Sequence, residues 1–409
     1  MKRYSEYKDS GVKWIGEIPG HWKICRTRYL CNINTGDKDT VMKEDNGKYP
    51  FYVRSPKIER INTFSYDGEA ILMAGDGVGA GKVFHYANGK FDYHQRVYNM
   101  HNICGVSGKF MFYFIRDQFH YAMEEKNAKS TVDSVRLPWL KAFPIAIPAQ
   151  EEQEAIVTYL DTKAAKIDEY ISIAEKKIAA LEELKQTIIT EAVTRGIHKD
   201  VPMKDSGVKW IGMIPEHWKI RKMKFVFKER SEKGYPNEPV LSATQSNGVI
   251  PQSMYENRVV VVNKGFENLK LVCKGDFVIS LRSFQGGIEY AYYRGIISAA
   301  YTILTKSAEF LNEGYVKNLF KSHPFVQLLK TCVTGIREGQ NINYSLLRDK
   351  YIPVPPLAEQ QEIVTYIEAK VANINQLCQA ERSQIEKLKE YKQRLISDVV
   401  TGKVKVTND

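Results

Sequence analysis

An internal duplication constrains the fold of this 409-residue chain more than any other feature of its sequence. Residues 9–24 return as residues 205–220, an offset of 196, and only two of the sixteen positions differ. A second match, at an offset of 207, joins residues 152–197 to residues 359–404. Chance does not produce two such matches in the same order, so we expect two copies of one structural unit in tandem.

The second match lies in two long stretches that we predict to be helices. Neither stretch contains Pro, and their apolar residues recur mostly at alternating steps of four and three. This heptad spacing is typical of a helix that packs lengthwise on another helix. The predicted contact seam consists of Ile156, Leu160, Ile167, Ile171, Ile178, Leu181 and Ile188 in the first stretch and Ile363, Ile367, Ile374, Ile385, Leu388 and Leu395 in the second.

Each predicted helix follows a globular region, so we predict an α+β chain with two mixed α/β domains and two long helices. The boundaries that we expect are residues 1–150 for the first globular domain, 151–198 for the central helix, 199–357 for the second globular domain, 358–404 for the C-terminal helix and 405–409 for a tail.

Short apolar runs between turn-forming residues predict the elements inside the globular domains. In the first domain they predict strands at 69–74, 82–87 and 97–103 and a helix at 109–125. In the second domain they predict a helix at 313–331, bent at Pro324, and strands at 258–263, 270–273, 276–281, 288–293 and 298–305. The repeated opening motif reads as a loop broken by Gly11 and Gly16 and anchored to the core by Trp14 and Trp22.

The formal net charge of +11 is unevenly distributed along the chain. Residues 1–150 carry +6 and residues 202–357 carry +9, whereas the helical segments 151–201 and 358–409 carry −4 and 0. Basic globular regions suit a polyanionic partner, most simply nucleic acid. A solvated basic surface without such a partner is equally compatible with this charge.

The sequence contains no motif for catalysis or metal binding. Residues 75–82, GDGVGAGK, lack the GxxxxGK[ST] spacing of a phosphate-binding loop, and we predict a glycine-rich hairpin there. The His and Cys residues show no metal-ligand spacing. We therefore expect no catalytic residue, metal site or cofactor in this chain. Since no apolar run is long enough for a membrane span or a signal peptide, we expect a cytoplasmic location.

Basic and amide side chains of the globular domains are the candidates for contacting DNA. Arg and Lys pair with guanine edges, and Asn and Gln pair with adenine edges. Each candidate can equally be a solvated surface residue, and the loops at 281–287 and 334–342 rank highest because they combine Gly, Arg and Gln. The candidates are Lys38, Arg54, Lys57, Arg60, Lys82, Gln95, Arg96 and Lys129 in the first domain and Arg230, Gln245, Asn247, Arg258, Arg282, Ser283, Gln285, Arg337, Gln340 and Asn341 in the second.

Taken together, these motifs resemble the specificity (S) subunits of type I restriction–modification systems. The resemblance rests on the repeated DSGVKWIGxIPxHW motif, the Gly-acidic-apolar strands that begin at Gly68 and Gly275, and the two long helices. It rests also on the Glu-Gln pairs that open both helices, at residues 152–153 and 359–360. The resemblance covers essentially the whole chain.

The resemblance implies two target recognition domains, each reading one half of a split DNA site. It implies that the helices form an antiparallel coiled coil, which relates the domains by a pseudo-twofold axis and docks two methyltransferase (modification) subunits. Motor-nuclease (restriction) subunits would join them. The chain would be a non-catalytic subunit of an adenine-specific methyltransferase and restriction endonuclease complex. S-adenosylmethionine, ATP and Mg would bind to the partner subunits.

The two domain interiors differ in sequence, so we predict an asymmetric bipartite DNA target. A fully helical 151–195 segment would be about 65 Å long at ~1.5 Å per residue. This length permits half-sites one DNA turn apart, roughly 34–36 Å. The sequence also permits a non-enzymatic coiled-coil scaffold whose two basic adaptor domains bind acidic proteins. A fused methyltransferase is disfavoured, because no cofactor-binding motif is present.

Overall fold

The computed structural model describes residues 2–126, 134–255, 265–334 and 341–406. The chain divides into two compact units, the first made of Met1–Ala174 with Arg382–Asp409 and the second of Glu175–Glu381. Each unit therefore contains one globular domain and one part of each long helix. No helix in the described ranges is long and apolar enough to cross a membrane.

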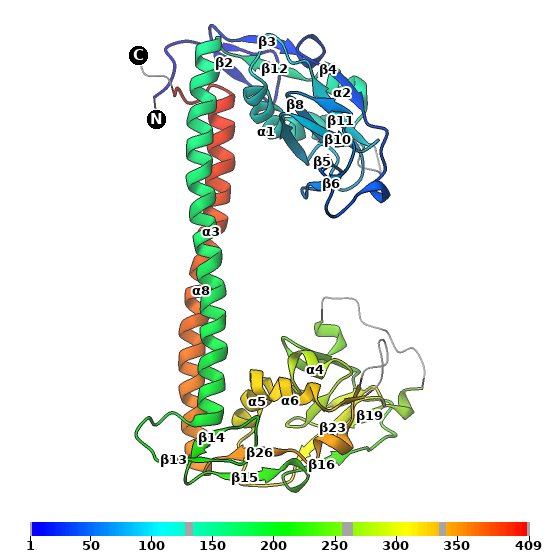
Figure 1. Cartoon of the computed structure of the whole chain (residues 1–409), viewed down its shortest axis with the longest axis vertical. Coiled ribbons are helices and arrows are strands. Elements are labelled where there is room, and N and C mark those ends of the chain that lie inside the picture. The colour runs from blue at the N-terminus through cyan, green and yellow to red at the C-terminus, as the bar shows by residue number, and fades with distance from the viewer. Residues whose placement is uncertain (1, 127–133, 256–264, 335–340, 407–409) are drawn as a thin grey trace. The chain divides into compact units, whose positions relative to one another are not determined.

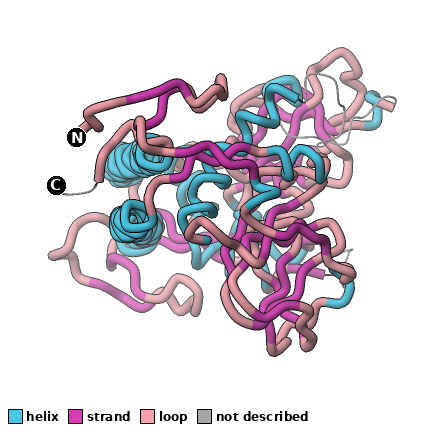
Figure 2. The backbone as a smooth tube through the Cα atoms, turned by 90° about the horizontal axis from the view of Figure 1, so that it is seen from above, coloured by secondary structure: helices cyan, strands magenta, loops and turns pink. Residues whose placement is uncertain are grey.

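The two long helices are α3 (Gln150–Arg195) and α8 (Leu357–Val400). In the first unit, Ile156 and Leu160 near the start of α3 share a buried core with Leu395 and Val399 near the end of α8. The helices therefore run antiparallel, and Figure 2 shows them end-on as neighbouring circles. The predicted antiparallel coiled coil is confirmed in this unit.

In the second unit, the end of α3 packs against the start of α8 in the same antiparallel manner. Ile189 and Val193 of α3 share a core with Ile363 and Ile367 of α8. Every residue of the predicted seam is buried or half-buried. The heptad pattern therefore identified the contact face of both helices.

The C-terminal helix ends four residues earlier than the predicted boundary at 404. Gly402 adopts φ +74°, a left-handed conformation that ends helices and favours Gly. Beyond it, the backbone of Lys405 forms a bridge with Lys2, so the two ends of the chain lie together in the first unit (Figure 1).

The repeated opening motif forms a β-hairpin in each unit, so the prediction of a loop was wrong for its two strands. In the first unit β1 (Tyr7–Asp9) pairs antiparallel with β2 (Glu17–Pro19), and in the second β13 (Met203–Asp205) pairs with β14 (Met213–Pro215). Three-residue strands carry too short an alternation to be recognised from sequence. The predicted anchoring by Trp22 is confirmed, since this side chain is fully buried.

A buried glutamate at the start of each long helix fastens the hairpin to the helix. Glu152 Oε2 lies 2.9 Å from His21 Nε2 and accepts a 3.1 Å hydrogen bond from Trp22 Nε1. Glu359 makes the same two contacts with His217 and Trp218, at 2.7 and 3.0 Å. In each unit the repeated His-Trp dipeptide therefore binds the glutamate of the repeated Glu-Gln dipeptide, and this contact joins the hairpin to the helix.

Each globular domain is built on the same frame of six strands. In the first domain β3 (Lys23–Arg26) pairs with β12 (Pro144–Ile147), and the four-stranded antiparallel sheet has the order β4-β11-β8-β9, with β4 Asn32–Thr35, β11 Val97–His101, β8 Ala70–Ala74 and β9 Phe84–Ala87. In the second domain β15 (Lys219–Lys222) pairs with β26 (Tyr351–Val354), and the sheet has the order β16-β23-β20-β21, with β16 Phe227–Arg230, β23 Thr302–Lys306, β20 Phe277–Ile279 and β21 Glu289–Tyr290.

Helices cover one face of each four-stranded sheet and pack into its core. Phe110 and Phe114 of α1 (Gly108–Lys126) share a buried core with Ile71 and Met73 of β8. In the second domain, α5 (Glu313–Lys321) and α6 (His323–Lys330) take this place. The predicted helix at 313–331 is therefore two helices, which separate at Ser322 because Pro324 starts α6.

The rest of each domain differs between the two copies, except that the short helices η1 (Thr27–Tyr29) and η3 (Met223–Phe225), and likewise α2 (Leu137–Ala142) and α7 (Tyr344–Leu347), occupy matching positions. The first domain adds the sheet β6-β5-β10-β7, with β5 Tyr49–Tyr52, β6 Glu59–Ile61, β7 Tyr66–Asp67 and β10 Lys90–Tyr93, and the helix η2 (Thr40–Met42). The second adds the pairs β17-β18 (Leu241–Thr244, Gly248–Pro251), β19-β22 (Lys270–Val272, Gly295–Ile297) and β24-β25 (Val333–Thr334, Asn341–Ile342) and the helices α4 (Ser283–Gly286), η4 (Gln252–Met254) and η5 (Phe266–Asn268).

Most of the strands that the sequence predicted belong to the frame, and one of them, β19, lies outside it. β8, β9 and β11 correspond to the predicted strands of the first domain, and β19, β20, β21 and β23 to four of those in the second. β23 starts at Thr302 rather than 298, because residues 298–301 form a turn. The strand predicted at 258–263 lies outside the described residues.

Candidate nucleic-acid interface

The loops that differ between the two domains gather at one end of each four-stranded sheet. In the first domain Val97 pairs with Ala74, so the turn before β11 and the loop after β8 meet at that end. β4 brings Lys38 to the same place, where its backbone forms a bridge with His94. This end of the sheet therefore collects several of the predicted DNA-contacting residues.

One carboxylate holds two exposed guanidinium groups at this end of the first domain. Arg54 Nη1 lies 2.9 Å from Asp76 Oδ1, and Arg96 Nε lies 3.6 Å from Asp76 Oδ2. The side chains of Arg54 and Arg96 remain 46% and 65% exposed. We call these three residues the Asp76 cluster. It presents a pre-oriented pair of planar donors of the kind that binds guanine edges or phosphate.

The buried side chain of His94 binds the backbone of Arg96, next to the Asp76 cluster. His94 Nδ1 accepts a 2.9 Å hydrogen bond from the backbone N–H of Arg96, and its Nε2 lies 3.8 Å from Asp39 Oδ2. Burial lowers the pKa of His94, and the positive charge of Arg54 lowers it further, which favours the neutral ring as an acceptor. Gln95 donates to Asp39 across 3.1 Å. Asp39, Asp76 and His94 were not among the predicted site residues.

The other candidates of the first domain have different surroundings. Arg60 donates to the carbonyl oxygens of Gly47 and Lys48, both at 2.8 Å, which holds its guanidinium group against the domain's own backbone, and its contact with DNA stays a prediction. Lys57 pairs with Glu59 at 3.3 Å. Lys82 is exposed on the loop that joins the antiparallel strands β8 and β9, which confirms the predicted hairpin. Lys129 lies outside the described residues.

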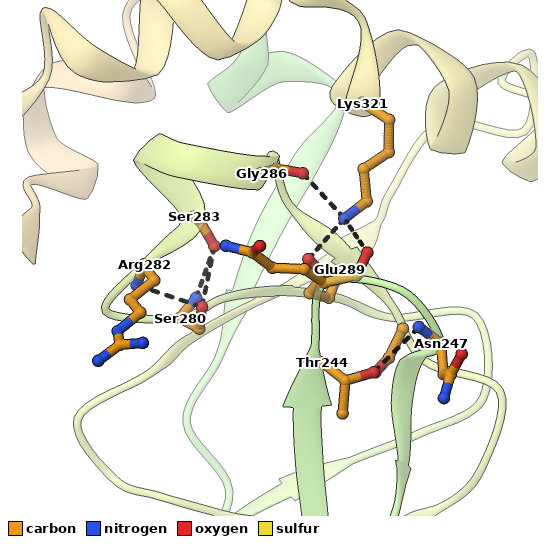
Figure 3. Close-up of polar contacts among 10 residues, drawn as sticks. Thr244, Asn247, Ser280, Arg282, Ser283, Gly286, Glu289 and Lys321 are labelled. Carbon is orange, nitrogen blue, oxygen red and sulfur yellow. Dashed lines mark hydrogen bonds and ion pairs between the residues drawn. The ribbon is translucent and has the colours of Figure 1, made fainter. Parts of the chain in front are cut away.

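In the second domain, Lys321 of α5 ties two candidate loops together. Its Nζ donates to the carbonyl oxygens of Gly286 and Gln245, at 2.9 and 3.3 Å, and lies 2.5 Å from Glu289 Oε1 (Figure 3). Burial raises the pKa of Glu289, and the ammonium group of Lys321 opposes that shift. Gly287 lies so close to α5 that a Cβ would stand 2.3 Å from the carbonyl oxygen of Phe320.

The tied loops expose amide and guanidinium side chains. Gln245 and Gln285 line one groove of about 1060 Å³ in the second unit, together with Lys317 and Lys321. The Arg282 side chain is exposed and extends away from the neighbouring serines (Figure 3). Amide side chains favour adenine edges, whereas the Asp76 cluster favours guanine. The two domains thus present different chemistry at the same end of the same frame.

Two candidates of the second domain are held by neighbouring groups of the same domain, and their contact with DNA stays a prediction. Ser283 is buried, and its Oγ accepts a 2.9 Å hydrogen bond from the backbone N–H of Ser280 (Figure 3). Arg230 Nε lies 3.1 Å from the buried Asp276, and its Nη1 lies 2.6 Å from Glu232.

The remaining candidates of the second domain are only partly placed. Asn247 is exposed in the β17–β18 turn, where its backbone N–H donates to Thr244 (Figure 3). Asn341 is exposed on β25. Arg258, Arg337 and Gln340 lie outside the described residues.

Known proteins share both the sequence pattern and the fold. Residues 19–183 and 215–387 match the family model for the type I restriction modification DNA specificity domain. The chain is 23% identical to the type I restriction enzyme EcoDI specificity subunit of Escherichia coli, over 95% of this chain and 90% of that protein. It is 24% identical to the MjaVIII specificity subunit of Methanocaldococcus jannaschii, over 98% of each.

Solved structures agree on the fold. A chain from a study of complex assembly and conformational transition in the type I R-M system covers 94% of this chain and 98% of its own length, with a TM-score of 0.66 and 15% identity. The HsdS subunit from Thermoanaerobacter tengcongensis covers 95% and 98%, with a TM-score of 0.50 and 16% identity. None of these similarities supports the scaffold alternative. The chain belongs to the DNA specificity family of type I restriction–modification systems and carries two of its recognition domains.

Proposed function

We propose that this chain reads an asymmetric, bipartite DNA site and brings modification subunits to it, without performing chemistry itself. One observation carries the proposal: the same frame occurs twice, and the two copies present different polar side chains at the same end. A symmetric reader would carry the same groups twice. The Asp76 cluster suits a half-site containing guanine, and the amides of Gln245 and Gln285 suit one containing adenine.

Repeated apolar residues on the long helices support the docking of two like subunits. Tyr170 and Leu377, related by the offset of 207, are 62% and 50% exposed. Leu184 and Tyr391, related in the same way, are both 48% exposed. Large apolar side chains left in water at matching positions suit a protein partner that is present twice.

The chemistry belongs, in this proposal, to the partner subunits. S-adenosylmethionine binds to the modification subunits, ATP and Mg bind to restriction subunits, and the complex acts on adenine in cytoplasmic DNA. In such a complex this chain supplies target choice and spacing. This division of labour accords with the lack of a catalytic motif in the sequence.

Methylation profiling tests the proposal directly. The chain is co-expressed with its modification subunit in a host that lacks both, and methylated adenines are mapped across the genome. The expected result is one split motif with two different halves, which disappears when this chain is omitted. A palindromic motif would contradict the asymmetric site. Methylation by the purified chain alone with S-adenosylmethionine would contradict its non-catalytic role.

A further inference from the structure

Two exposed aromatic rings occupy the same position in the two copies of the frame. Tyr29 is 68% exposed and Phe225 is 66% exposed, and the offset of 196 relates them. A cation lies over each ring: Arg28 Cζ is 5.6 Å from the Tyr29 centroid, and Lys224 Nζ is 5.5 Å from the Phe225 centroid. We call Arg28 with Tyr29, and Lys224 with Phe225, the basic–aromatic pairs.

Rigid turns present both basic–aromatic pairs. The backbone N–H of Thr27 donates to Phe143 O, and that of Met223 donates to Lys350 O, both at 2.9 Å. Both donor residues are fully buried at the start of η1 and η3. The rings therefore point outward from fixed backbone positions rather than from loose loops.

The basic–aromatic pairs lie away from the candidate DNA-contacting loops. Tyr29 comes before β4, whose first residue pairs with His101, whereas the Asp76 cluster lies beyond the opposite end of this strand, near Val97. Phe225 likewise comes before β16, and the loop that contains Arg282 lies beyond the opposite end of the sheet. A contact with DNA half-sites does not account for their position.

Both copies of the frame contain a basic–aromatic pair, although the sequence around it differs between them. Residues 25–31 and 221–227 differ at all seven positions, yet both contain a basic residue followed by an exposed aromatic one. Half-sites of an asymmetric target differ, so groups that read them need not match. A feature present in both copies suits a partner that is itself present in two like copies.

We propose that the basic–aromatic pairs are matching anchors for two copies of the modification subunit, one on each domain. The inference rests on the proposed function. The docking surface would offer an apolar pocket for the ring and carboxylates near the cation, since buried aromatic and Arg side chains dominate protein interfaces. Lys224 also pairs with Asp349 at 2.6 Å, whereas no carboxylate takes this place beside Arg28 in the described ion pairs. The ring is therefore the shared anchor.

The test measures assembly of the full chain with its modification subunit. Subunit number is counted by native mass spectrometry, and affinity is measured by titration of Tyr29→Ala, Phe225→Ala and the double variant. Each single variant should weaken one of the two binding steps about tenfold or more, and the double variant should weaken both. Phe64→Ala is the matched control, since Phe64 is 43% exposed beneath Lys90 without a repeated counterpart, and should leave both steps unchanged.

Three outcomes would overturn the inference. The first is unchanged affinity in the double variant while the wild-type complex assembles and methylates normally, which leaves the proposed function intact. The second is an equal loss with Phe64→Ala, which would indicate a general effect of exposed aromatic rings. The third is weakened DNA binding with normal assembly, which would identify the rings as DNA contacts. A wild-type chain that binds no modification subunit would instead refute the proposed function.

Discussion

Replacing Lys321 with Met should damage the second recognition domain selectively. The substitution keeps the aliphatic volume but removes the cation from Glu289, a side chain that is only 2% exposed. Oε2 of this carboxylate has no hydrogen-bond partner in the described residues. The backbone carbonyl oxygens of Gly286 and Gln245 also lose their donor. The two candidate loops would then lose the side chain that links both of them to α5.

The size of the stability loss depends on whether the buried Glu289 carboxylate stays ionised or becomes protonated. An ionised Glu289 without its partner costs about 3–5 kcal/mol. Protonation limits this cost to about 3.4 kcal/mol at pH 7, from ~1.36 kcal/mol for each pH unit above the ordinary pKa of 4.5. Two unpaired carbonyl groups add about 1 kcal/mol each where water does not replace the donor. We expect the second domain to lose roughly 3–5 kcal/mol of unfolding free energy.

Hydrogen exchange resolved by peptide is the suitable assay, because a two-unit chain need not unfold in one step. Exchange should accelerate in residues 241–251 and 279–290 of Lys321→Met and stay unchanged in the first domain. The double variant Lys321→Met, Glu289→Gln should recover part of the loss, since it leaves no buried charge. Lys317→Met is the matched control, because Lys317 lies one turn earlier in the same groove and, among the described residues, contacts the Tyr292 ring at 4.9 Å without an ion pair.

The loss of stability in the second domain should also change which DNA sequence is methylated. Methylation profiling of Lys321→Met should show relaxed bases in one half of the motif and unchanged bases in the other. A variant that loses less than about 1 kcal/mol would show that Glu289 gains a proton or water at little cost, against the reasoning above. Equal relaxation of both halves would show that the loops of one domain do not read a separate half-site.

Three further predictions address the other parts of the chain. Arg96→Ala should relax one guanine position of one half-site by about 1–3 kcal/mol, and Asp76→Asn should do so partially, as read from methylation motifs. Replacing Ile178 and Leu181 with Asp should cost several kcal/mol by placing charge in the helix seam, and unchanged thermal stability would contradict the helix pair. Because the pKa of His94 is depressed, its stabilising effect is complete above the ordinary value of 6.5 and is lost as pH falls through its folded-state pKa. A His94→Asn variant should therefore show a flatter decline of first-domain protection between pH 7 and 5.

The frame could be predicted from the sequence because it depends on repeated, strongly periodic segments. Heptad spacing predicts the helix seam, and continuous apolar runs predict β8 and β20. The four-residue strands β4, β5 and β10 escaped prediction because none is a continuous apolar run: β4 is mostly polar, β5 contains Pro50, and β10 contains Lys90 and Asp92. Their pairing is decided by distant partners, as in the parallel contact of Asp92 with Phe51, which no local pattern encodes.

The roles of individual charged residues could not be predicted for a related reason. Arg96 and Arg230 could not be told apart in the sequence, since each is an arginine at the end of a short strand: Arg96 directly precedes β11, and Arg230 is the last residue of β16. Arg230 meets Asp276, whose side chain is 3% exposed, whereas Arg96 meets Asp76, whose side chain is 27% exposed. The first pair is mostly buried, with Arg230 20% exposed, whereas the second is open to solvent, with Arg96 65% exposed. Burial of the partner separates the two roles, and burial is a property of the folded chain.

The register of the long helices could not be predicted from the heptad pattern either. Apolar seam positions recur every seven residues, so a slip of one heptad would still place apolar side chains against each other. Polar contacts between the helices do not remove this freedom. Lys392 lies 2.6 Å from Asp168, but after a slip of one heptad it would meet Asp161 or Glu175, which are also acidic. The hairpin region of the first unit contacts both helices, since Trp22 donates to Glu152 of α3 and Tyr7 donates to the carbonyl oxygen of Gly402, just after α8. The heptads thus specify that the helices pair, and contacts with the hairpin region specify where.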